Sequence, residues 1–182
     1  MHQNKLSGAV PVELGKLGCI VNLAGNPELE HGPDVPPSER FALEELFRST
    51  EGTRWTCNVR WMSYEKVATW YKLGVLASHV HSLVMSSNNM VGRLPESISQ
   101  LKHLRMVELA TMPGLTGTLP HSLCSITSLR RLCICRCSLK GRIPDQIGNL
   151  RQLEELQVHI YIYIYMCVCM FLLLFHLLNG FE

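Results

Sequence analysis

The sequence has little excess charge of either sign, because 17 basic side chains are balanced by 15 acidic ones over 182 residues. Proteins that bind nucleic acid mainly through its phosphates need a basic surface. A formal net charge of +2 gives no such surface. We therefore predict no nucleic-acid partner.

Signals for secretion and for metal binding are also missing. No Asn-x-Ser/Thr glycosylation acceptor occurs, and the N-terminus has no apolar leader segment. The eight cysteines include no Cys-x-x-Cys pair, so neither a zinc motif nor a disulfide framework is indicated. These absences slightly favour a reducing, cytoplasmic compartment, with a membrane location as the alternative.

Motifs of common enzymes are absent as well. GAVPVELGK is similar to a phosphate loop, but Leu17 stands where Ser or Thr would bind magnesium, and Pro11 interrupts the loop. The sequence has no His-Arg-Asp or Asp-Phe-Gly triplet and no Gly-x-Ser-x-Gly elbow. We predict a non-enzymatic protein without a cofactor. The alternative is a regulatory region of a kinase or GTPase whose catalytic part is absent.

The main feature that is present is an internal repeat, in which three segments superimpose from Leu83, Val107 and Leu132. Each segment carries a glycine followed three residues later by a proline, and the successive spacings are 25 and 24 residues: Gly92, Gly117 and Gly141, with Pro95, Pro120 and Pro144. A period of this length is typical of a solenoid, whose repeats bury their apolar faces only by stacking.

The triplets LVM, VEL and LCI place their outer residues on one face of a short strand. The segment LRRLCICRCSLKGRIPDQIGNLRQL resembles the plant- and alga-type leucine-rich repeat, LxxLxLxxNxLxGxIPxxIGxLxx, and the resemblance covers about residues 38–158. It implies an α/β leucine-rich-repeat solenoid, with parallel strands on the concave face and loops, short 3-10 turns or helical turns on the convex face. In that family an Asn hydrogen-bonds neighbouring coils at a position held here by Asn88, Met112 and Cys137, so we expect only the first coil to complete this ladder.

A different segment, SERFALEELFRSTEGTRW, precedes the repeat. Its apolar residues recur at helical spacing: Ala42, Leu43, Leu46 and Phe47. We predict a helix with Ser38 as its N-cap that stops at Gly52. Three tryptophans follow and are predicted to be buried anchors: Trp55, Trp61 and Trp70. The segment is similar to the helical Trp-rich cap that precedes plant- and alga-type arrays.

The predicted organisation has five parts, and the chain begins in the middle of a repeat, which favours a fragment of a larger protein. The parts are 1–29, the end of an upstream leucine-rich array; 30–37, a linker; 38–79, the helical Trp-rich cap; 80–158, an array of about three repeats; and 159–182, a hydrophobic low-complexity tail.

The tail breaks the repeat immediately after Val158. Tyr165 stands where the repeat requires glycine, and Val168 where it requires proline. Alternating AT and GT dinucleotide tracts would encode the Ile-Tyr and Val-Cys alternations of HIYIYIYMCVCM, so we interpret the tail as translated intron. Residues 160–178 are also long and apolar enough for a transmembrane helix, and a membrane partner is expected only in that case.

Two groups of potential ligands are predicted not to bind metal. The repeat register places Cys133 and Cys135 on the concave surface and Cys137 in the core, so the three thiols do not converge. His79 and His81 share one face of a strand, but no third ligand is evident.

The remaining candidate site is the concave face. Its predicted residues are Ser82, Val84, Ser86, Met106, Glu108, Ala110, Arg131, Cys133, Cys135, Arg136 and Glu155. The resemblance implies protein or peptide ligands, which suit an extended solenoid surface. We predict a non-catalytic recognition scaffold for protein–protein or peptide binding; the alternative is a membrane-anchored, receptor-like fragment.

Overall fold

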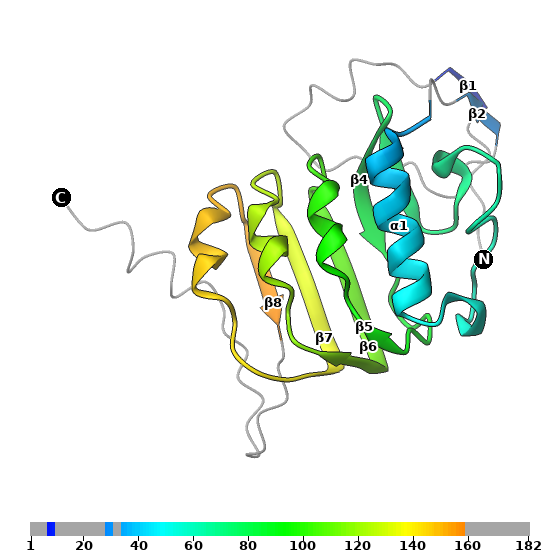
Figure 1. The fold of residues 1–182 in the computed structure, drawn as a ribbon. Coiled ribbons are helices and arrows are strands. Elements are labelled where there is room, and N and C mark those ends of the chain that lie inside the picture. Colours follow the sequence, from blue (N-terminus) through cyan, green and yellow to red (C-terminus); the bar gives the residue numbers. More distant parts are fainter. Residues whose placement is uncertain (1–6, 10–27, 31–33, 159–182) are drawn as a thin grey trace.

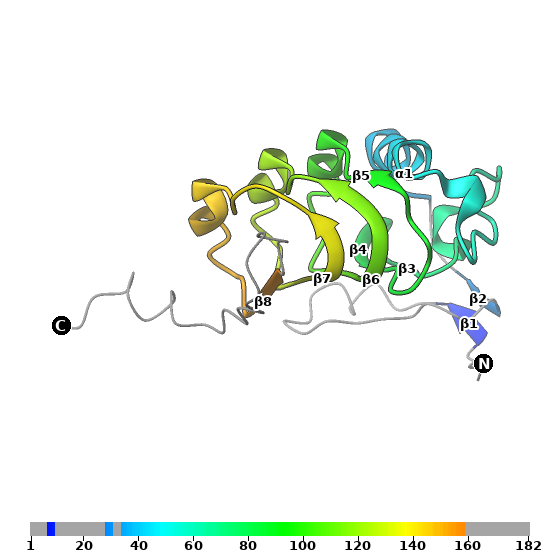
Figure 2. The same ribbon diagram turned by 90° about the horizontal axis from the view of Figure 1, so that it is seen from below.

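The computed structural model describes residues 7–9, 28–30 and 34–158 (Figure 1). The main sheet has the strand order β3 (Leu73–Leu76), β4 (His79–Val84), β6 (Met106–Gly117), β7 (Arg131–Leu139) and β8 (Glu155–Val158), and β5 (Gly92–Arg93) pairs with β6 beside this path. Figure 2 shows the strands on one side of the body and a row of helices on the other. This arrangement is the predicted leucine-rich-repeat solenoid, and the fold class is confirmed.

The strands β4, β6, β7 and β8 run parallel and in register, so equivalent leucines and valines stack across the coils. Leu83, Val107 and Leu132 are aligned in this way and are fully buried. At the start of the strands, each coil also donates a backbone hydrogen bond to the coil before it: Arg105 N–H to the His81 carbonyl at 2.8 Å, Arg130 N–H to Arg105 at 2.9 Å, and Glu154 N–H to Arg130 at 2.7 Å. The apolar column and this chain of bonds fix the spacing of the coils.

The convex side is built from three equivalent 3-10 helices, η4 (Glu96–Gln100), η5 (His121–Ser125) and η6 (Asp145–Asn149). Each begins directly after the proline of the Gly-x-x-Pro turn. The glycines of these turns, Gly92 and Gly117 among them, have positive φ angles, which explains why glycine recurs there. The helix of the cap lies next to η4 in the same row (Figure 2).

The cap helix α1 spans Pro37–Ser49 and buries the four apolar residues that its spacing predicts. Its predicted ends were wrong. The N-cap is Pro36, with Pro37 in the first turn, because proline supplies a helical φ and lacks the N–H that a side chain would cap. Ser38 is exposed, and the helix ends three residues before Gly52. Gly52 instead begins η2 (Gly52–Arg54), packed against the ring of Phe47.

The three tryptophans form the core of the cap, as predicted, and each is at most 6% exposed. The rings of Trp55 and Trp61 lie edge to face at 4.8 Å, and Trp70 lies 5.1 Å from Trp61. Phe47 of α1 contacts the Trp55 ring at 5.1 Å. This aromatic cluster is continuous with the hydrophobic core of the array, so the cap and the coils share one core.

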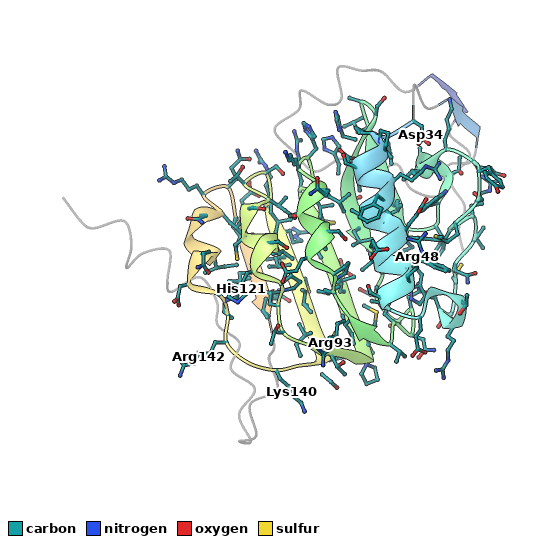
Figure 3. The ribbon with its side chains drawn as sticks, viewed as in Figure 1. Asp34, Arg48, Arg93, His121, Lys140 and Arg142 are labelled. Carbon is teal, nitrogen blue, oxygen red and sulfur yellow. The ribbon has the colours of Figure 1, made fainter. Side chains whose placement is uncertain are left out.

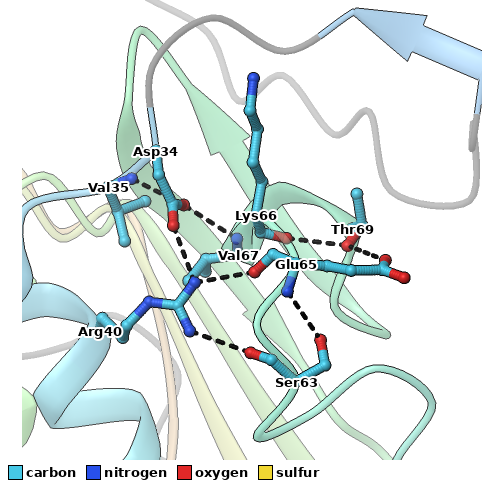
Figure 4. A network of polar contacts seen from close by, with 8 residues as sticks. All are labelled: Asp34, Val35, Arg40, Ser63, Glu65, Lys66, Val67 and Thr69. Atoms are coloured by element: carbon cyan, nitrogen blue, oxygen red, sulfur yellow. Dashed lines mark hydrogen bonds and ion pairs between the residues drawn. The ribbon is translucent and has the colours of Figure 1, made fainter.

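A polar network ties the beginning of α1 to the loop before η3 (Val67–Thr69), as Figure 4 shows. Arg40 forms an ion pair with Asp34 at 2.8 Å and donates to the carbonyls of Ser63 and Glu65. Burial alone would raise the pKa of Asp34, but hydrogen bonds from Arg40 and from the Val67 and Val35 amides outweigh it and lower the pKa. Asp34 lies in the segment predicted as the linker, and these contacts attach it to the cap.

An antiparallel hairpin joins the cap to the array. Strand β3 pairs with β4 through a turn at Ala77 and Ser78, whose φ angles are 48° and 62°. Two consecutive left-handed residues are typical of the tight turns that match the twist of a hairpin. Strand β3 therefore covers the edge of the first parallel strand.

The predicted upstream array is described only in part. Strand β1 (Ser7–Ala9) pairs in parallel with β2 (Glu28–Glu30), and the other residues of that repeat lie outside the described ranges. The tail from residue 159 onward, with its translated-intron and transmembrane interpretations, also lies outside them. In the described part of the chain, no helix combines the length and apolarity needed to cross a membrane.

Candidate functional site

The predicted concave residues fall into three rows that run across the strands. The pairing aligns the first row as Ser82, Met106, Arg131 and Glu155, and the second as Val84, Glu108, Cys133 and Gln157. Ala110 and Cys135 are paired in the third row, which Ser86 extends. We call these three rows the concave face.

Two predicted residues of the first row are not accessible. Ser82 is 1% exposed and Met106 is 9% exposed, so neither offers much surface to a ligand. Ser82 has a short side chain flanked by Gly74 of β3 and Met106 of β6, and Met106 lies in turn between Ser82 and Arg131. The accessible face therefore lies mainly in the second and third rows and at the Arg131 end of the first.

The other predicted residues are accessible to differing degrees. Arg136 is exposed, and the rest are half-buried: Val84, Ser86, Glu108, Ala110, Arg131, Cys133, Cys135 and Glu155. Half-burial in a sheet leaves the ends of the side chains available while their bases pack against neighbours. This is the exposure expected of a preformed binding surface.

Polar groups on the concave face are linked to one another. Arg131 Nε forms an ion pair with Glu155 Oε2 at 2.5 Å, and Gln157 donates to the other Glu155 oxygen at 2.9 Å. The Ser86 hydroxyl donates to Glu108 at 2.8 Å. These bonds hold the carboxylates in place, and the face presents both signs of charge.

The first three coils each have a left-handed residue, within or shortly after the concave strand, that the sequence pattern did not reveal. Ser87, Thr111 and Arg136 occupy equivalent positions, and their φ angles are 58°, 58° and 54°. All three are exposed, at the side of the face where the extended backbone turns. No glycine marks these positions, so only the repeat register could have indicated them.

The position following each left-handed residue is the predicted ladder position. Asn88 does not bond a neighbouring coil; its side chain accepts from the Cys57 N–H at 2.8 Å and donates to the Cys57 carbonyl at 3.0 Å. It therefore joins the first coil to the cap. Cys137 bonds the preceding coil through its thiol, which lies 3.3 Å from the Leu109 carbonyl. Met112 is fully buried and packs in the core.

The predicted histidine pair gains a third member from the next coil. The ring of His79 stacks on that of His103 at 3.8 Å, and His81 lies 6.2 Å from His103. Buried Glu39 of α1 bonds the Nδ1 of His79 at 2.7 Å and accepts from the Val80 N–H at 2.8 Å. The described residues contain no group of three or more His, Cys, Asp or Glu side chains placed to hold a metal ion.

Folding is expected to become less favourable as the pH falls from about 6.5 towards 4. Burial, followed by the charges of Arg105, His103 and His79, lowers the pKa of His81 from 6.5 to about 4. In this window the unfolded chain binds a proton that the folded chain excludes, so acid favours unfolding by about 2 kcal/mol. Urea unfolding at pH 7 and at pH 4.5 measures the difference. His81→Gln should reduce it and exposed His121→Gln should not; equal pH dependence in both variants would refute the assignment.

Elsewhere, the basic residues Arg93, Lys140 and Arg142 lie along the edge of the body where the Gly-x-x-Pro turns occur (Figure 3). A hollow of about 290 Å³ lies near Arg142, between η5 and η6. Its lining residues are Thr118, Leu119, His121, Arg142, Ile143, Pro144, Asp145 and Gln146. Its volume is at the small end of the range for ligand pockets. Its lining is an even mixture of polar and apolar groups, whereas ligand pockets are predominantly apolar. The concave face remains the better candidate.

Comparisons with known proteins agree with this architecture. The sequence pattern described as Leucine Rich Repeat matches residues 128–150. Over 161 residues the chain is 39% identical to Receptor-like protein 6 of Arabidopsis thaliana, and the alignment covers 87% of this chain and 16% of that protein. The chain thus spans about one sixth of the length of this curated relative. A receptor-like relative does not support the cytoplasmic location that the sequence slightly favoured.

Solved structures show the same solenoid. The structure titled PEPR1-AtPEP1 superimposes with a TM-score of 0.58 at 25% identity, covering 69% of this chain and 18% of that chain. The BIR3–SERK2 complex from Arabidopsis thaliana superimposes with a TM-score of 0.55 at 23% identity, covering 64% and 65%. The second match shows the fold alone.

Proposed function

Because this chain is a plant-type leucine-rich-repeat solenoid, we propose that it is a non-catalytic recognition scaffold whose concave face binds a protein or an extended peptide. The observation that carries the proposal is the alignment of half-exposed side chains in register across parallel strands. Adjacent strands lie about 4.8 Å apart, so a ligand laid across them meets a new side chain at each coil. A regular surface of this kind suits an extended chain.

The charges of the face narrow the type of ligand. Glu155 is ion-paired with Arg131, and Glu108 lies beside Cys133 in the second row. Arg136 is exposed and follows Cys135 of the third row. A face that carries both positive and negative charges favours a partner with both acidic and basic groups. It does not favour a polyanion. The likeness to Receptor-like protein 6 and to the PEPR1-AtPEP1 structure supports a protein or peptide partner.

The receptor-like relative also supports an extracellular or membrane-associated location for the protein to which this chain belongs. Membrane anchoring through the tail is the alternative form of the same proposal. Fractionation of expressing cells, with alkaline extraction of the membranes, tests both, and recovery of the chain in the cytosol alone would contradict them.

Panning a displayed library of peptides against the full chain should yield binders that depend on Glu108. Glu108→Lys reverses a charge in the second row, and we expect it to weaken those binders by about tenfold or more, as for a residue inside an interface. Titration of each purified peptide by fluorescence anisotropy measures the change.

Asp145→Lys is the matched control, because it reverses the same charge at an exposed site on the convex side. It should leave the affinity unchanged. Peptides that lose binding to the Asp145 variant but not to the Glu108 variant would place the ligand on the convex side and refute the proposal.

A further inference from the structure

Two free thiols lie side by side on the concave face. Cys133 and Cys135 occupy alternate positions of β7, their sulfur atoms are 3.8 Å apart, and both residues are half-buried. We propose that this pair is a reversible redox site, in which a hydroperoxide oxidises the two thiols to a disulfide within the strand.

The backbone permits this bond but does not favour it. Alternate residues of an extended strand have Cα atoms about 6.6–6.8 Å apart, at the upper end of the range that disulfides span. The sulfurs already face each other, so closure requires a small movement. Pairing with β6 and β8 on both sides resists that movement. The resulting disulfide is strained and is readily reduced again.

The surroundings set this pair apart from the other cysteines of the described ranges. Cys124 and Cys137 are 1% and 5% exposed, and the Cys137 thiol is held by the Leu109 carbonyl. Cys57 belongs to the cap, where its backbone bonds the Asn88 side chain. Within those ranges, Cys133 and Cys135 therefore combine partial exposure with a neighbouring thiol.

The environment also indicates an order of reaction. Burial, followed by the neighbouring Cys135 and the carboxylates of Glu108 and Glu155, raises the pKa of Cys133 to about 12, so Cys133 keeps its proton. Cys135, which pairs with Ala110 rather than with a carboxylate, is the sulfur that attacks the peroxide oxygen. The O–O bond breaks, Cys135 becomes a sulfenic acid, and the released hydroxide takes up the proton lost by Cys135.

The second step closes the bond. The Cys133 sulfur attacks the Cys135 sulfur, the S–O bond breaks, and the departing hydroxide takes the Cys133 proton as water. In total, two thiols and one hydroperoxide give a disulfide and two molecules of water or, with an organic peroxide, one water and one alcohol. The two electrons pass from the sulfurs to the peroxide oxygens.

Oxidation would alter the centre of the proposed binding face, and this consequence rests on the proposed function. The Cys133 thiol now donates to the side-chain oxygen Oε1 of Gln157 at 3.6 Å, in the row that contains Glu108. A disulfide removes both S–H donors and draws Cys133 away from Gln157. The redox site itself is measured without any ligand, so its failure and the failure of the proposed function are distinguishable.

The test uses the tryptic peptides of the full chain. Cleavage after Arg131 and Arg136 releases Leu132–Arg136, LCICR, which contains these two cysteines and no other. The native protein is treated with hydrogen peroxide, and the remaining thiols are alkylated in denaturant. The protein is then digested with trypsin, and the masses of the peptides are measured by mass spectrometry. We expect an unalkylated LCICR that is lighter than the dithiol form by about 2 Da, the mass of two hydrogens. Treatment with dithiothreitol before alkylation should restore the doubly alkylated peptide.

Two controls make the result decisive. The peptide Cys137–Lys140, CSLK, reports a buried thiol in the same digest, and it should oxidise at least about tenfold more slowly. Cys133→Ser should abolish the 2 Da loss and leave Cys135 as a sulfenic acid that a dimedone probe captures. The proposal is overturned if LCICR stays doubly alkylated when CSLK is already oxidised, or if Cys133 and Cys135 form bonds only to other cysteines.

Discussion

Gly92→Ala is expected to destabilise the fold by about 3–5 kcal/mol, the range of severe core substitutions. Gly92 has a φ angle of 124°, which an alanine rarely adopts, and a methyl group there would overlap the carbonyl oxygen of Ser49 at the end of α1. Backbone strain and overpacking each cost about 1–3 kcal/mol. Because the overlap is with backbone, a side chain cannot move aside to relieve it. Urea unfolding followed by circular dichroism measures the loss.

The equivalent glycine of the third coil separates the two causes. Gly141 has a φ angle of 90°, but a methyl group there would meet only the Thr118 side chain, at 3.1 Å. We expect Gly141→Ala to cost about 1–2 kcal/mol, from the left-handed backbone alone. Equal losses in the two variants would show that the contact between α1 and the first turn is not as close as described.

Asn88→Ala should cost about 2–4 kcal/mol and should loosen the cap more than the later coils. The substitution removes both hydrogen bonds to the Cys57 backbone. Each backbone group left without a partner lowers the stability of the fold by about 1–3 kcal/mol. Asn88 is 3% exposed, so water cannot readily replace its side chain. Hydrogen exchange should accelerate at the Cys57 amide before it changes at the strands β6 and β7.

Asn89→Ala provides the neighbouring control. Its side chain donates one hydrogen bond to the Arg54 carbonyl, at 3.0 Å, and the site is exposed. We expect a loss of about 1 kcal/mol or less, because water can take over that bond and only the left-handed backbone, with a φ angle of 56°, disfavours alanine there. A loss as large as that of Asn88→Ala would mean that the link between cap and array is spread over the loop rather than concentrated at Asn88.

The repeated parts of this fold could be predicted from the sequence because the same physical requirement recurs in each coil. Leu132 and Ile134 alternate with polar neighbours, as a half-buried strand demands, and both are fully buried. Pro144 lies three residues after a glycine and directly before a 3-10 helix, as in the two coils before it. The buried tryptophans were predictable for another reason, since large aromatic residues in a short segment have few other places to pack.

Other features could not be predicted, because they depend on contacts between segments that are distant in the sequence. Ser82 counts as concave by alternation, yet at its place between β3 and β6 it is only 1% exposed. Asn88 was expected to bond a neighbouring coil, but the first coil has the cap there instead. Cys137 replaces an Asn of the ladder and was not expected to bond a neighbouring coil. Its thiol nevertheless bonds a carbonyl of the preceding coil.

The hydrogen bonds at the strand starts have a direction, and it suits folding during synthesis. The N–H groups of Arg105, Arg130 and Glu154 each bond a carbonyl of the coil that was made before them. A coil leaving the ribosome therefore finds its acceptor and its apolar neighbour already in place. Each addition closes a loop of one repeat only, so its entropic cost does not grow with the number of coils. We therefore expect the capped first coil to fold before the coils that follow it.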